Sequence, residues 1–211
     1  MSRMPRAEAV RPAPRPRPLK TRVNVWARTL HTYTSVVSLL AVLFFALTGI
    51  TLNHPDWAFG NSQTRQEYAG TLPAGWLQGG QVNWLAVAEE LRSRHGLHGR
   101  AGDTRVDGGE ASLSFKAPGY GADAFIDTAT GRYTLTVDAQ GAVAVLNDLH
   151  RGRDSGRAWG WLIDLSGALL ALVSLTGLVI LLYLKRTRGP ALALLLAGGL
   201  LTGLLMWRAL G

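Results

Sequence analysis

The chain contains no cysteine among its 211 residues, so disulfide bonds, cysteine-ligated zinc or iron–sulfur centres and thiol chemistry are all excluded. Charged residues are scarce as well, at 17% of the sequence, whereas hydrophobic residues make up 47%. The hydrophobic residues concentrate in three uncharged runs, 32–52, 165–184 and 190–207. Each run is near the ~20 residues that a helix needs to cross a ~30 Å hydrocarbon layer. The sequence therefore predicts an α-helical membrane protein with three transmembrane helices.

Acidic residues are nearly missing from the start of the chain, where residues 1–28 carry eight Arg and Lys against Glu8 alone. Residues 54–160 are almost balanced, with ten basic and twelve acidic side chains, and the link 185–188 adds three positive charges. Positive charge favours the cytoplasmic side of a membrane. We therefore expect a cytoplasmic N-terminus and link, an outer 54–160 segment and an outer C-terminus. The net charge of +8 is explained by topology, so no nucleic-acid partner is expected.

The first apolar run is longer than the 7–15 residues of a signal peptide and lacks a small-residue cleavage site after it. We interpret it as a retained span. The Arg/Pro-rich stretch 11–18 before it favours neither a helix nor a packed core, which predicts a disordered tail near anionic lipid.

The segment after the first run reads as a small α+β domain over about 82–147. A helical pattern over 82–95 places four apolar residues on one side and ends at Gly96: Trp84, Leu85, Ala88 and Leu91. Alternating apolar residues then predict strands at 111–116, 122–127, 132–137 and 142–146. The expected core consists of Leu91, Leu113, Phe115, Phe125 and Tyr133. Residues 58–80 are rich in Gly, Gln and Asn and are expected to form a loop or lid.

Three motifs resemble those of one family. The stretch "Phe-Ile-Asp127-Thr-Ala-Thr130-Gly131" looks like the Asp-x-x-Thr-Gly turn of PepSY domains. Two Leu-His pairs, at His31 and His150, are each followed along the chain by a Leu-Thr-Gly triplet in a membrane helix, as in PepSY-associated transmembrane proteins. The resemblance covers about residues 25–188. It implies a bacterial inner-membrane protein whose PepSY-like domain lies in the periplasm.

A more distant resemblance to ferric-siderophore reductases implies haem b on membrane histidines, transmembrane electron transfer and an oxidoreductase role. It also implies a periplasmic flavoprotein or a ferric siderophore as partner, besides the lipid bilayer. The chain departs from that pattern because it has three spans rather than four, and its last span contains no histidine or acid. No nicotinamide or flavin fingerprint is present, so electrons would have to come from quinol or from a partner.

The resulting domain plan runs in order along the chain. It comprises a basic cytoplasmic tail (1–28), transmembrane helix 1 (29–53), a periplasmic segment (54–158), transmembrane helix 2 (159–184), a cytoplasmic link (185–189), transmembrane helix 3 (190–207) and a periplasmic C-terminus (208–211).

Three histidines lie near span ends and are candidate haem ligands. His31 and His54 are 23 residues apart, so on one helix they are separated by roughly 34 Å and cannot bind the same iron. His54 and His150 both fall at the outer surface and could form a bis-imidazole site. His31 would then need a second copy of the chain, a different protein or a non-histidine ligand. Thr34, Ser35 and Ser38 on its helix would leave room for a flat macrocycle.

Each histidine also has a structural interpretation. His31 could form hydrogen bonds at the level of the lipid headgroups, and His54 could cap the helix before Pro55. His95 and His98 are expected to be exposed loop residues rather than metal ligands.

Asp164 lies inside the second span, where an acid is costly without a partner. Its carboxylate could accept a hydrogen bond from the imidazole N–H of His54 or His150 and so orient that histidine as a ligand. Alternatively, it could form a hydrogen bond with a loop arginine or with the backbone. Small residues of the last two spans, including Gly177 and the pair Gly199/Gly203, are expected to serve close helix packing.

Two functions remain open from the sequence. One is a haem-b electron carrier or ferric reductase component, and the other is a non-enzymatic, membrane-anchored interaction or regulatory protein with structural histidines.

Overall fold

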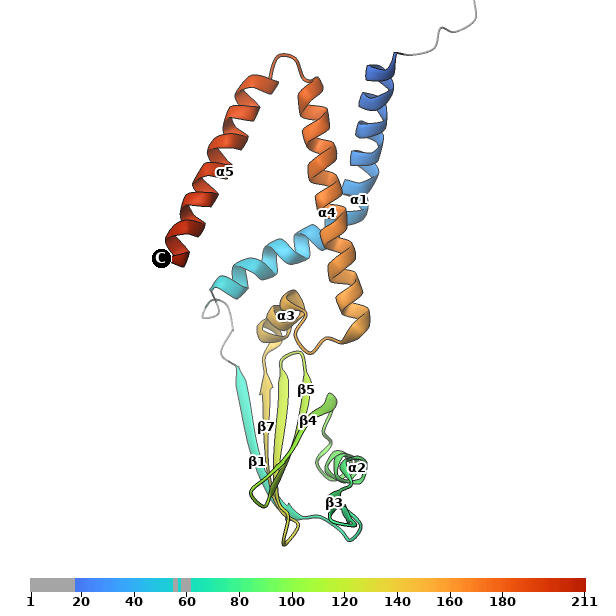
Figure 1. The fold of residues 1–211 in the computed structure, drawn as a ribbon, viewed down its shortest axis with the longest axis vertical. Helices are drawn as coiled ribbons and strands as arrows, with labels where there is room; N and C mark the ends of the chain where they lie inside the picture. Colours follow the sequence, from blue (N-terminus) through green and yellow to red (C-terminus); the bar gives the residue numbers. More distant parts are fainter. Residues whose placement is uncertain (1–17, 55–56, 58–61) are drawn as a thin grey trace, which may run out of the picture. The chain divides into compact units, whose positions relative to one another are not determined.

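The computed structural model describes residues 18–54, 57 and 62–211. Most of the expected basic tail, residues 1–17, and the first part of the expected 58–80 loop lie outside the described residues. Within them the chain contains five helices, three of them long and apolar enough to cross a membrane. These three are α1 (Leu19–Asn53), α4 (Gly156–Tyr183) and α5 (Arg188–Leu210) (Figure 1).

The chain divides into two compact units, and each is described here by itself. The first unit contains the start of α1, to residue 37, together with α4 from residue 169 and all of α5. The second unit, 38–168, contains the end of α1, the sheet, two shorter helices and the start of α4.

An antiparallel sheet of five strands follows α1 and precedes α4 in the chain, in the spatial order β1-β7-β6-β5-β4. Its strands are β1 (Gln63–Thr71), β4 (Arg100–Asp107), β5 (Glu110–Ala117), β6 (Tyr120–Asp127) and β7 (Arg132–Gln140). A small hairpin of β2 (Leu77–Gln78) and β3 (Gln81–Val82) leads into α2 (Trp84–His95). The last helix of this unit before α4 is α3 (Ala142–Arg151).

Helix α2 covers one face of the sheet (Figure 1). Its buried residues are Val87, Ala88 and Leu91, and Trp84 packs beside them, which is the i, i+3, i+4, i+7 spacing of one helix face. Leu85 falls outside that spacing and is 73% exposed, so its expected place on the buried side is wrong. Asn83 caps the helix by accepting from the Ala86 amide.

The residues of β5, β6 and β7 that face α2 alternate along these strands, as a one-sided sheet requires. Strands β5 and β7 contribute Leu113, Phe115, Tyr133 and Leu135, all buried. In β6 the residues in phase are Ala122, Ala124 and Ile126. Phe125 is out of phase and 45% exposed on the opposite face, so its expected place in the core is also wrong.

The turn between β6 and β7 is organised by Asp127. Its Oδ1 accepts three hydrogen bonds, from the Ala129 and Thr130 amides and from the Thr130 hydroxyl, at 2.8–2.9 Å. Gly131 closes the turn at a φ of +69°, where a side chain would be strained and would also meet the Trp76 indole. The Asp-x-x-Thr-Gly motif is therefore a structural element of this sheet.

Two expectations for the flanking segments are corrected. Residues 63–71, expected within a loop, form edge strand β1 paired along its whole length with β7. Residues 142–146, expected as a strand, are the first half of α3, whose end is set by Gly152 in the left-handed conformation. The Ala-Val alternation suggested a strand, but Asn147 and His150 continue one helical face from Val143.

Candidate functional site

His150 lies near the end of α3 and contacts α1 within the second unit. Its Nδ1 is 2.7 Å from the Thr48 hydroxyl, and a Cβ built at Gly49 would lie 3.5 Å from its Cε1. The Phe45 ring meets the imidazole edge-on at 5.2 Å between centroids. We call His150, Thr48 and Gly49 the His150 site.

Neighbouring contacts hold α3 at this place. One turn before His150, the buried Asn147 accepts from the Thr51 hydroxyl of α1 at 2.9 Å. The Leu149 carbonyl accepts from the indole N–H of Trp159 in α4 at 2.8 Å. The imidazole is therefore carried by a helix that is hydrogen-bonded on both sides, which restricts its movement.

The first unit contains a similar arrangement between α1 and α4. Here His31 belongs to α1, and its Nδ1 is 3.0 Å from the hydroxyl of Thr176 in α4. The same nitrogen is 3.1 Å from the Val173 carbonyl. A Cβ built at Gly177 would lie 3.4 Å from the His31 Cε1. We call His31, Val173, Thr176 and Gly177 the His31 site.

Each site thus pairs one Leu-His with one Leu-Thr-Gly from the other helix. The threonines are buried, at 4% exposure for Thr48 and 7% for Thr176, and both imidazoles are half-buried. In each case Nδ1 is engaged and Cε1 lies against a glycine. The second ring nitrogen, Nε2, makes no recorded hydrogen bond in the described part of the chain. An unprotonated Nε2 is a good metal or haem ligand.

The two remaining predicted site residues lie elsewhere. His54 follows α1, stacks on Trp57 at 3.8 Å between centroids and has its Nε2 3.3 Å from the Asn53 amide nitrogen. Asp164 is exposed on α4. Within the described residues, no hydrogen bond or ring contact joins His150 to His54 or either imidazole to Asp164. Their joint action stays a prediction.

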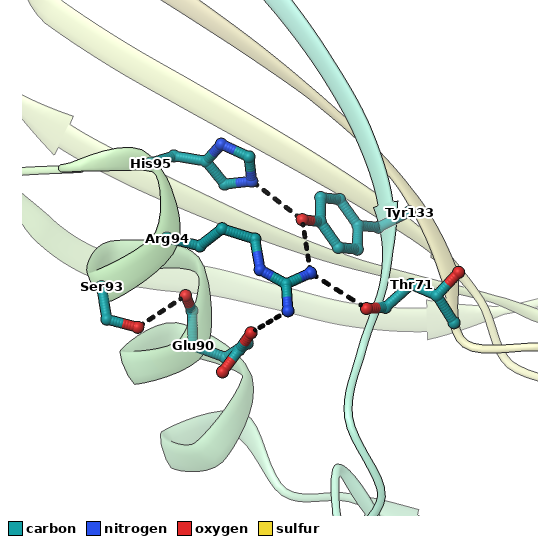
Figure 2. Close-up of polar contacts among 6 residues, drawn as sticks. All are labelled: Thr71, Glu90, Ser93, Arg94, His95 and Tyr133. Atoms are coloured by element: carbon teal, nitrogen blue, oxygen red, sulfur yellow. Dashed lines mark hydrogen bonds and ion pairs between the residues drawn. The ribbon is translucent and has the colours of Figure 1, made fainter.

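One of the two loop histidines differs from expectation, whereas His98 is an exposed loop residue as expected. His95 is the last residue of α2 and is half-buried, so its expected exposure in a loop is wrong. Figure 2 shows its Nε2 accepting from, or donating to, the Tyr133 hydroxyl at 2.8 Å. Arg94 reaches the same hydroxyl at 3.4 Å and pairs with Glu90 at 2.6 Å. Burial, and then the charge of Arg94, lower the pKa of His95. This cluster joins α2 to the sheet.

No group of three or more His, Cys, Asp or Glu side chains suited to holding a bare metal ion occurs among the described residues. The His150 and His31 sites each contain a single imidazole instead. Both histidines are recognisable in the sequence as candidates, but the threonines and Val173 were not predicted as their partners. The signal was the repeated Leu-Thr-Gly triplet, which ends each of the two family motifs.

The fold and the two sites define a class of protein: a membrane protein in which apolar helices joined through His–Thr contacts accompany a one-layer antiparallel sheet covered by a helix. The sequence profile of the PepSY_TM-like family matches residues 25–210, and the chain belongs to this family. No curated protein matches the chain. No solved structure matches it either.

Proposed function

We propose that this protein binds haem b through His31 and His150 and transfers electrons across a bacterial inner membrane. The observation that supports the proposal is the repeated geometry of the two sites. In both, Nδ1 is held by a buried threonine at 2.7–3.0 Å while Nε2 has no recorded hydrogen bond within the described residues. A bound b-type haem would supply one-electron redox chemistry, with its potential set by the ligands and the surroundings.

The donor chemistry fits a haem better than a bare ion, because each site offers one imidazole and apolar surroundings. A haem held by two protein side chains would need a second residue at each site. His54 belongs to the same unit as His150 and is the candidate there, provided that it leaves its stack on Trp57. For His31, a second copy of the chain in a homodimer is the candidate.

The proposed orientation follows from charge. The basic residues at the start of the chain and in 185–188 favour a cytoplasmic N-terminus and a cytoplasmic α4–α5 link. The sheet region would then lie in the periplasm, where it could meet a flavoprotein or a ferric siderophore. Electrons would run from quinol or a partner to a ferric acceptor, one per step.

Purification of the full chain from haem-supplemented cells tests the proposal. We expect a Soret band and a reduced-minus-oxidised spectrum of b type. His31→Ala and His150→Ala should each reduce the haem content. His98 stacks on Tyr120 in the sheet region, so His98→Ala should leave the haem content unchanged. Wild-type protein without a Soret band would exclude this function.

A second candidate function is a membrane-anchored interaction protein, and the uncovered face of the sheet favours it. Phe125 lies exposed there beside a hollow of about 540 Å³ whose lining includes Glu110, Arg132 and Thr134. An exposed aromatic residue with charged and hydroxyl neighbours suits a protein partner. A haem-free protein that loses a partner upon Phe125→Ser, but not upon His31→Ala, would support this function instead.

A further inference from the structure

We propose that Thr48 and Thr176 are positioning residues that hold His150 and His31 as the Nδ1–H tautomer and so present Nε2 as the donor atom. The part of the proposal that concerns the tautomer depends only on contacts within this chain. The part that concerns iron rests on the proposed function. The two parts are tested by different measurements.

The proton on His31 can be assigned from its partners. The Val173 carbonyl, 3.1 Å from Nδ1, can only accept a hydrogen bond. The Thr176 hydroxyl has one proton, and carbonyls of its own helix lie within reach of it, Leu172 at 2.7 Å and Val173 at 3.0 Å. The His31 Nδ1 therefore donates to the Val173 carbonyl oxygen and to the Thr176 hydroxyl oxygen. In the neutral ring, Nε2 then carries a lone pair.

The same accounting applies to His150. The Thr48 hydroxyl is 2.7 Å from the Phe44 carbonyl, four residues back in α1, and 2.7 Å from the imidazole Nδ1. A single hydroxyl proton cannot serve both partners. Because the bond to the helix carbonyl is local and available whether or not the imidazole is present, the hydroxyl donates there and accepts from Nδ1.

Thr202 shows that the local bond forms without an imidazole. Its hydroxyl donates to the Gly198 carbonyl in α5 at 2.9 Å, and no histidine contacts it among the described residues. It makes the same i−4 bond as Thr48 and Thr176, in the third apolar helix. Thr202 is thus a matched control for substitutions at the two sites.

The glycines fit the same role. At Gly49 and Gly177 an added Cβ would just reach contact with Cε1, at 3.5 and 3.4 Å. Cε1 lies between the two ring nitrogens, so a larger side chain would push the ring away from the threonine. The Thr-Gly pair therefore sets both the ring's hydrogen bond and its distance from the helix.

Nitrogen-15 NMR of histidine-labelled full chain in detergent, without haem, tests the tautomer directly. We expect His31 and His150 to show a protonated Nδ1 and an unprotonated Nε2 in the neutral ring. Thr176→Val should alter the signals of His31 alone, and Thr48→Val those of His150 alone. Thr→Ser at either position should restore the wild-type pattern, and Thr202→Val should change neither histidine.

Each site serves as the folding control for the other, since unfolding would alter both histidines. An Nε2–H tautomer at His31 or His150 in the wild type would overturn the proposal. Unchanged histidine signals in a folded Thr→Val variant would overturn it as well.

The haem-loaded protein tests the second part. Mutation of a residue that hydrogen-bonds a metal-ligating histidine typically reduces metal affinity by about 10–100-fold. Thr48→Val and Thr176→Val should therefore weaken haem retention by at least about 10-fold and shift the midpoint potential. Unchanged affinity and potential in both variants would overturn the positioning role while the proposed function stands. A wild type that binds no haem would overturn the proposed function and with it the iron part, but not the tautomer assignment.

Discussion

At the residue scale, Asp127 shows how one side chain defines a turn. Its carboxylate accepts three hydrogen bonds from residues 129 and 130, and those from Thr130 lower its pKa most. A carboxyl whose pKa is lowered in the folded state stabilises that state above its ordinary pKa of ~3.9 and loses this contribution as the pH falls through the folded-state value. We expect Asp127→Ala to increase hydrogen exchange in the β6–β7 turn of the full chain at pH 7.

Acid provides the control for this prediction. The difference in exchange protection between wild type and Asp127→Ala should shrink below pH ~4, where the wild-type carboxylate becomes protonated. Asp127→Asn keeps an acceptor oxygen without the charge, so its turn should show no change in protection over the same range. A difference that stays constant down to pH 2 would show that the charge of Asp127 does not matter.

His95 predicts a second pH dependence, at higher pH. Burial and Arg94 lower its pKa, so the unfolded chain takes up the proton first. The stabilisation is fully present above ~6.5 and is lost as the pH falls through the lower folded-state pKa. Tyr68, Tyr133, Arg94 and Glu90 are the polar or charged groups beside it.

We therefore expect hydrogen-exchange protection of α2 to decrease between pH 7 and pH 5 in the wild type. The His95→Gln variant should show little decrease in the protection of α2, because the substitution removes the titrating imidazole. Equal slopes for the two proteins would assign the pH dependence to another residue.

At the scale of single elements, helix α2 depends on one leucine and not on another. Leu91 is fully buried against the sheet, whereas Leu85 is 73% exposed on the same helix. Leu91→Ala should lower the free energy of unfolding of the sheet region by about 2–5 kcal/mol, as for other buried leucines. Leu85→Ala should stay within about 0.5 kcal/mol of wild type. Denaturant titration with exchange detection at β5 and β7 measures both, and equal losses would contradict the packing described here.

Elements with strong local patterns could be predicted from the sequence. The three apolar helices, α2 and the strand–turn–strand around Asp127 each carry their own signal in hydropathy or turn chemistry. Strand β1 could not be predicted, because its polar residues 63–71 show no alternation and its conformation comes from pairing with β7, some 70 residues away. Helix α3 was mistaken for a strand because four residues of Ala and Val alternate, followed by Leu146, before its helical face is complete.

The candidate sites were predictable only in part, because their partner residues, like those of β1, are distant in the sequence. A histidine at a span end is visible in the sequence, but its partner is a threonine on another helix. Conversely, Gly199 and Gly203 were expected to serve close packing, yet at either position an added Cβ meets no atom of the described residues within 4 Å. Small residues permit a close helix approach without requiring one.

At the scale of the whole molecule, the open question is which side of the membrane each part occupies. The charge pattern predicts that 185–188 lie in the cytoplasm and that the sheet region and C-terminus lie in the periplasm. The natural absence of cysteine makes this testable, because every single-cysteine variant carries one thiol. Thr64 of β1, Thr187 before α5 and Ala209 near the C-terminus are all exposed and suit substitution by cysteine.

We expect a membrane-impermeant maleimide to label Thr64→Cys and Ala209→Cys in intact spheroplasts, and Thr187→Cys only after permeabilisation. Alkaline phosphatase fused after Gly211 should be active, and the fusion after Arg188 inactive, because the enzyme folds only outside the cytoplasm. The two methods are independent, since one measures the accessibility of a thiol and the other the folding of a fused enzyme. Labelling of Thr187→Cys in intact spheroplasts together with an active fusion after Arg188 would invert the orientation. The sheet region would then face the cytoplasm, and a periplasmic flavoprotein or ferric siderophore could no longer be its partner.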